Sequence, residues 1–60
     1  MCESNVYLEK EGKEVLILKD VDFIQPMGDQ ILLRDILGEE KLLKNRIKFV
    51  SFSDHKIILE

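Results

Sequence analysis

Short apolar runs alternate with turn-forming residues along the chain, a pattern typical of β-strands joined by tight turns. Val6, Leu8 and Lys10 fall on one side of an extended segment, and Glu14 to Lys19 form a second run with β-branched residues. Between them, Glu11-Gly12 predicts a turn, because glycine takes positive φ without steric cost. The two runs therefore predict a β-hairpin.

The middle of the chain continues in the same way. Residues 20–24 predict a short strand or a bend, and Pro26, Gly28 and Asp29 predict a loop. Residues 30–35 alternate as a third clear strand.

The segment from Lys41 to Phe52 is ambiguous. Leu43, Ile47 and Val50 have roughly helical spacing, whereas β-branched and aromatic residues dominate its second half. We therefore favour a strand from Arg46 to Phe52.

A turn around Gly38, a turn at Ser53-Asp54 and a last strand over residues 56–59 complete the pattern. Five or six short strands with frequent turns predict an all-β fold, as a small antiparallel barrel or sandwich. We expect one domain over residues 1–60.

Size and composition add a constraint. A chain of 60 residues, 45% of them hydrophobic, is near the lower limit for folding without a disulfide, a bound metal or a partner subunit. Cys2 is the only cysteine, so no disulfide forms within the chain. We therefore expect a homodimer, a bound metal or both. No signal peptide or membrane-spanning run is visible, and a free thiol suits the cytoplasm.

Charge leaves a second function open. The formal net charge is -3, which disfavours general nucleic-acid binding. Nevertheless, residues 41–48 concentrate Lys41, Lys44, Arg46 and Lys48. Small barrels bind RNA through cations beside aromatic residues, here Tyr7, Phe49 and Phe52. The alternative prediction is a small β-barrel RNA-binding module.

We expect no catalytic site and no organic cofactor. The chain has one His, no glycine-rich phosphate loop and no zinc-ligand spacing, and it is too short for a typical substrate cavity. Carboxylate pairs such as Asp20 with Asp22 fit a solvated surface. We therefore predict a binding protein and not an enzyme.

Cys2 is the candidate metal ligand. If Met1 is removed, one residue carries both an α-amine and a thiol, which form a five-membered chelate around a metal ion. Nitrogen and thiolate donors in a plane suit Ni(II) or Cu(II). Two copies of Cys2 would complete a four-donor site. A frayed terminus or a buried apolar cysteine is the alternative.

The sequence resembles the CooT family of small nickel-binding proteins, formerly labelled predicted RNA-binding proteins. The resemblance covers essentially the whole chain. It rests on Met1-Cys2-Glu3-Ser4-Asn5-Val6-Tyr7-Leu8, Gly12, Val21-Asp22, Ile31-Leu32-Leu33, Gly38-Glu39 and Asp54-His55-Lys56-Ile57-Ile58-Leu59.

This resemblance implies a dimeric β protein in which Cys2 ligates Ni(II), with a second ligand in the partner subunit. It also implies a nickel-enzyme client such as carbon monoxide dehydrogenase, although some relatives occur without that enzyme. His55 lies far along the chain from Cys2, at an expected turn. We expect a structural or solvated role for it.

Overall fold

The computed structural model describes residues 3–60, which form six strands of one sheet. The strands are β1 (Ser4–Lys10), β2 (Lys13–Met27), β3 (Gln30–Asp35), β4 (Glu40–Leu43), β5 (Ile47–Ser51) and β6 (Lys56–Leu59). Residues 3–60 include no helix that could cross a membrane. The all-β prediction is confirmed.

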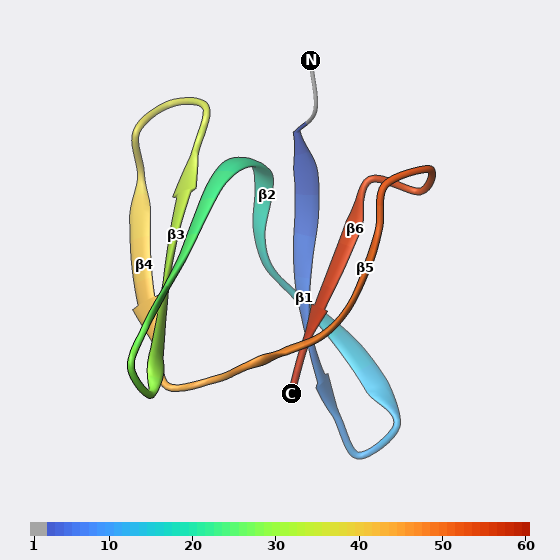
Figure 1. The fold of residues 1–60 in the computed structure, drawn as a ribbon. Coiled ribbons are helices and arrows are strands. Elements are labelled where there is room, and N and C mark those ends of the chain that lie inside the picture. Colours follow the sequence, from blue (N-terminus) through green and yellow to red (C-terminus); the bar gives the residue numbers. More distant parts are fainter. Residues whose placement is uncertain (1–2) are drawn as a thin grey trace.

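The strands follow the order β4-β3-β2-β1-β6-β5. All neighbouring pairs are antiparallel except β1 and β6, which run parallel. The sheet curls strongly, yet its edge strands β4 and β5 do not pair with each other, so it does not close into a barrel (Figure 1). The arrangement thus differs from the expected antiparallel barrel in one strand pair and in its open side.

β2 is longer than the sequence pattern predicts. It continues through a bend at Asp20, where φ is 57°, and through Pro26 to Met27. The predicted loop is reduced to a turn at Gly28 and Asp29. β1 pairs with β2 only as far as Val21, so the second half of β2 has β3 as its single neighbour. Proline is tolerated in such an edge position, and Pro26 lies in this half.

The ambiguous segment contains two strands, β4 and β5. Leu43 pairs with Ile31, and Val50 pairs with Ile57, so both lie on the side of the sheet that carries the core. Ile47 pairs with Leu59 on that same side. The apparent helical spacing of these residues therefore reflects one shared side of two different strands.

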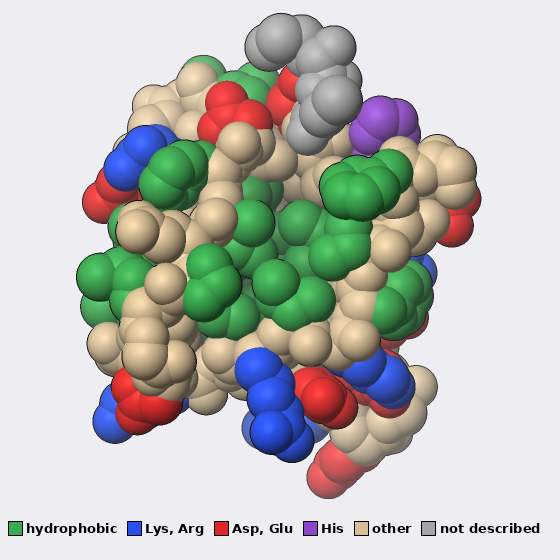
Figure 2. All heavy atoms as spheres, in the orientation of Figure 1, with side chains coloured by type: hydrophobic (Ala, Val, Ile, Leu, Met, Phe, Trp, Pro, Cys, Tyr) green, Lys and Arg blue, Asp and Glu red, His purple; other side chains and the backbone are tan. Residues whose placement is uncertain are grey.

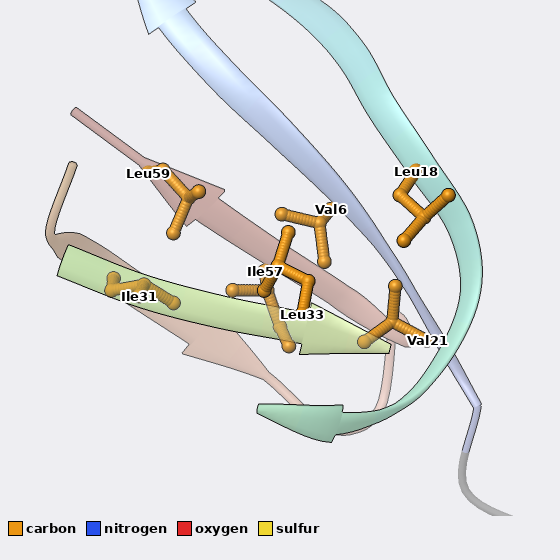
Figure 3. Packing of buried hydrophobic residues seen from close by; sticks show 7 residues of the cluster. All are labelled: Val6, Leu18, Val21, Ile31, Leu33, Ile57 and Leu59. Atoms are coloured by element: carbon orange, nitrogen blue, oxygen red, sulfur yellow. The ribbon is translucent and has the colours of Figure 1, made fainter. Parts of the chain in front are cut away.

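The core lies on the inner side of the curled sheet. Val6, Leu33 and Leu59 are fully buried there, whereas Ile58, which is also fully buried, lies between Ile57 and Leu59 and faces the other side of β6. Side chains from four strands converge in Figure 3, namely Val6, Leu18, Val21, Ile31, Leu33, Ile57 and Leu59. The parallel pairing of β1 with β6 thus joins the first and last strands of the chain through the core.

Candidate functional site

The predicted ligand Cys2 lies outside the described residues, which begin at Glu3. In Figure 1, the start of β1 lies at the same end of the sheet as the bend of β2, the turn 36–39 and the turn 52–55. We call this the amino-terminal end. The opposite end holds the turns 11–12 and 28–29, the loop 44–46 and Glu60 (Figure 1).

Asn5 connects three segments at the amino-terminal end. Its backbone N–H donates to the carbonyl oxygen of His55 at 2.9 Å. Its side-chain Oδ1 accepts from the backbone N–H of Asp20 at 3.1 Å. The start of β1 is therefore tied both to the last turn of the chain and to the bend of β2.

Asp35 organises the turn 36–39. Its side chain is 9% exposed, and its Oδ1 accepts backbone N–H groups of Leu37 at 2.9 Å and of Glu39 at 2.8 Å. The next residue, Ile36, donates its N–H to the carbonyl oxygen of Asp20 at 3.0 Å. The turn is thus joined to the bend of β2, which Asn5 already holds.

His55 lies beside the start of the described chain. Its ring Nδ1 is 3.2 Å from the carbonyl oxygen of Glu3, and its φ of 52° is left-handed. The sequence separation of these two residues is 52, and the parallel register that pairs Asn5 with Lys56 brings them together. The predicted structural role fits this contact. Sequence reasoning missed the proximity to Glu3, because no local pattern reports a parallel pairing of distant strands.

Glu3 carries an unpartnered buried oxygen. Its Oε2 has no hydrogen-bond donor among residues 3–60. Burying an unpaired polar atom costs free energy, more so when it bears charge. A positive group at this position would therefore be stabilised, and the peptide bond of Glu3 leads directly to Cys2.

Within residues 3–60, no three His, Cys, Asp or Glu side chains are grouped closely enough to hold a metal ion. Both the His55 imidazole and the Glu3 carboxylate belong to the amino-terminal end, but the ring contacts the backbone carbonyl oxygen of Glu3 and not its carboxylate. Imidazole nitrogen suits divalent nickel, whereas carboxylates suit harder ions such as Mg²⁺. Residues 3–60 do not complete a nickel site by themselves, so Cys2 and a second chain are the sources of the remaining donors to test.

The basic stretch of residues 41–48 is divided by the fold. Lys41 is on β4, Lys44 and Arg46 are in the loop, and Lys48 is on β5. Two of these cations have acidic partners: Lys48 Nζ is 2.5 Å from an oxygen of Glu9, and Arg46 pairs with Glu60. Such pairing reduces the charge left for phosphates, and the RNA-binding alternative gains no support from it.

A cleft of about 740 Å³ lies at the opposite end, so the expectation that the chain is too short for a hollow of this size is wrong. Its lining comprises Pro26, Gly28, Asp29, Gln30, Ile31, Lys44, Asn45, Arg46, Ile47 and Glu60. None of these residues belongs to the amino-terminal end. This cleft is therefore separate from the start of the described chain at Glu3.

Comparison with known proteins agrees with the resemblance seen in the sequence. The family model described as CO dehydrogenase accessory protein CooT matches residues 1–60. An uncharacterized protein of Methanocaldococcus jannaschii is 30% identical over 60 residues, which cover 100% of this chain and 98% of that protein. A crystal structure described as a CooT of Carboxydothermus hydrogenoformans is 37% identical, with a TM-score of 0.93 over 98% of this chain and 95% of that one. The chain belongs to the CooT family of CO dehydrogenase accessory proteins.

Proposed function

We propose that the protein is a homodimeric Ni(II)-binding accessory protein that carries or stores nickel for a metalloenzyme. The observation that carries the proposal is the match to the CooT family over residues 1–60, which includes Cys2. CO dehydrogenase, the enzyme in the family's description, requires nickel. It is the first client to test, and the protein itself would act without catalysis, in the cytoplasm.

Cys2 supplies the thiolate. Removal of Met1 would add the α-amine of the same residue, and the two donors would chelate one ion. Two chains would then provide two nitrogen and two sulfur donors, a set that suits planar Ni(II). Protons compete for both donor types, so nickel affinity would fall as the pH is lowered.

The open side of the sheet supports a second copy as the partner. Figure 2 shows apolar side chains gathered in a hollow at the middle of one face. Ile47 and Val50, on the core side of β5, are 37% and 38% exposed. The edge strands β4 and β5 also leave backbone groups unpaired at this opening. A second chain would cover both the apolar side chains and the edges.

The dimer surface can be tested by one substitution with a matched control. Val50→Glu places a charge on the core side of β5 and should weaken dimerisation about 100-fold, as for a residue central to an interface. Leu42→Glu is the control, because Leu42 is 51% exposed and pairs with Leu32 on the other side of the sheet. Analytical ultracentrifugation measures both. Equal dimerisation of the Val50 variant and the wild type would exclude this surface.

Nickel binding can be tested by titrating Ni(II) into the untagged protein. A thiolate-to-nickel absorption band should grow and saturate. Cys2→Ser should abolish the band, while its circular dichroism spectrum stays that of the wild type. A form with an uncleaved amino-terminal tag tests the amine separately. Undiminished nickel affinity in the Cys2→Ser variant would refute the proposed function.

A further inference from the structure

We propose that the amino-terminal end of the sheet is a docking surface for a partner protein with a basic surface, and that Leu37 and Phe52 are its two apolar anchors. The inference rests on the proposed function for the choice of partner, which is the enzyme that the protein would serve. The surface itself is built entirely from residues that the structure describes, and it does not depend on which groups hold the metal.

Leu37 and Phe52 are much more exposed than the other large hydrophobic residues of the described chain. They are 89% and 82% exposed, whereas the next of these residues within 3–60, Val15, is 53% exposed. Leu37 lies in the turn 36–39 and Phe52 in the turn 52–55, and these two turns lie on either side of the start of β1 (Figure 1). Single exposed apolar residues are ordinary, but here the two most exposed ones share one end of the molecule.

The turn that carries Leu37 has an ordered backbone. The N–H of Leu37 donates to the buried carboxylate of Asp35, which also accepts the N–H of Glu39. The backbone N–H of Asp35 donates to the carbonyl oxygen of Glu39 at 2.9 Å, and its own carbonyl oxygen accepts the N–H of Gly38 at 3.0 Å. Because the turn is fixed before a partner arrives, binding through the Leu37 side chain loses little conformational freedom.

The turn that carries Phe52 is held in a similar way. Its carbonyl oxygen accepts the N–H of His55 at 3.3 Å, and Oγ of Ser51 accepts the N–H of Asp54 at 3.3 Å. The carbonyl oxygen of His55 in turn accepts the N–H of Asn5 on β1. The phenylalanine is therefore presented to solvent from a turn that is anchored on the sheet. Aromatic side chains are enriched in protein–protein interfaces, which fits a role as an anchor.

Unpaired charges define the chemistry of the partner. At the amino-terminal end, the exposed carboxylates that form no ion pair within residues 3–60 are Asp20, Asp22, Glu39 and Asp54. Of the exposed lysines without an ion pair in this part of the chain, Lys19 is at that end, whereas Lys10, Lys13 and Lys44 are at the opposite end. Interfaces bring complementary potentials together. The partner surface is therefore basic, with apolar pockets for Leu37 and Phe52.

The anchors can be tested with purified CO dehydrogenase, prepared without nickel and immobilised for biolayer interferometry. Leu37→Ala and Phe52→Ala should each lower the affinity for the enzyme at least about tenfold, as expected for interface anchors. Val15→Ala is the matched control, because it also shortens an exposed aliphatic side chain but lies beside the turn 11–12. It should retain wild-type affinity. Wild-type affinity in the Leu37 and Phe52 variants would overturn the proposal.

The charge of the partner can be tested by varying the salt concentration. The affinity of the wild type for CO dehydrogenase should fall as ionic strength rises, because salt screens exposed charges. Glu39→Lys should lower the affinity and make it less sensitive to salt. Asp29→Lys, in the turn 28–29 of the opposite end, should leave both properties near those of the wild type. Affinity that does not respond to salt would exclude a basic partner surface.

Further measurements separate docking from dimerisation and from nickel binding. Analytical ultracentrifugation of Leu37→Ala and Phe52→Ala should show the wild-type oligomeric state, and a loss of dimers would make this end a contact between two copies and refute the proposal. Nickel binding through Cys2 without any binding to CO dehydrogenase would refute the docking surface alone. Enzyme binding that depends on Leu37 and Phe52, in a protein that binds no nickel, would refute the nickel function alone. Thermal unfolding of each variant confirms that the fold is retained.

Discussion

The two ends of the sheet are held together in different ways. At the amino-terminal end, hydrogen bonds link His55 to Asn5, Asn5 to Asp20, and Asp20 to Ile36, so that two turns, the bend of β2 and the start of β1 form one network. At the opposite end, Arg46 and Glu60 exchange backbone hydrogen bonds and form an ion pair, but the arginine side chain is 84% exposed. Exposed ion pairs contribute little to stability.

Under the proposed function, the amino-terminal end is the part of the molecule that needs precise geometry. Metal ligands must be held by surrounding hydrogen bonds, because a small displacement weakens the site. The network around Asn5 surrounds the residues that follow Cys2. The contrast predicts that equivalent substitutions will lower the free energy of unfolding strongly at the amino-terminal end and only slightly at the opposite end.

Asp35→Ala should have the largest effect on the free energy of unfolding. It removes the acceptor of two backbone N–H groups, of Leu37 and Glu39, in a buried position. We expect a loss of about 2–3 kcal/mol in urea unfolding, since hydrogen bonds to charged groups are involved. Asp29→Ala in the exposed turn of the opposite end is the control and should change stability by less than about 0.5 kcal/mol. Equal losses would contradict the comparison.

Asn5→Ala should have an intermediate effect. The Asp20 N–H loses its acceptor while the bend keeps its left-handed φ, and we expect a loss of about 1 kcal/mol. Asn5→Asp retains an oxygen acceptor and should recover most of the loss. Arg46→Ala, which removes the exposed ion pair with Glu60, should cost less than about 0.5 kcal/mol. A larger loss from Arg46→Ala than from Asn5→Ala would reverse the comparison.

The smallest effect should be a loss of stability at alkaline pH, which arises at two lysines outside the hydrogen-bond network of the amino-terminal end. The hydrogen bond to Glu9 raises the pKa of Lys48 above its usual 10.5, and the hydrogen bond to Glu14 does the same for Lys56. A raised pKa in the folded state stabilises the fold fully below 10.5, and this contribution is lost as the pH rises through the folded-state value. The free energy of unfolding in urea should be slightly lower above this pH range than below it. Glu9→Gln should reduce the decrease, and an increase would contradict the assignment.

The sequence pattern predicts most of the strands but not the pairing of the first strand with the last. The predicted strands overlap β1, β3 and β6, and the predicted strand Arg46–Phe52 encloses β5. β4 was not predicted as a separate strand. Its half-buried positions are Lys41 and Leu43 while Leu42 is exposed, so its apolar residues do not alternate. The pairing of β1 with β6 depends on packing between distant segments, which local periodicity does not encode.

The candidate site likewise has one part that the sequence predicts and one part that only the fold shows. Cys2 can be predicted from its residue type and from the family resemblance, and its role as a ligand stays a prediction, because it lies outside the described residues. The position of His55 beside Glu3 follows only from the parallel register. Residue chemistry therefore predicts the metal ligand, whereas the neighbours of the residue that follows Cys2 are known only from the fold.

Native mass spectrometry of the untagged protein with and without Ni(II) shows whether two chains bind one nickel ion through Cys2. It reports terminal processing, subunit number and metal content together. We predict a dimer of chains without Met1 that binds one nickel ion, and a Cys2→Ser dimer that binds none. A nickel-loaded monomer, or equal nickel content in the Cys2→Ser protein, would contradict the account.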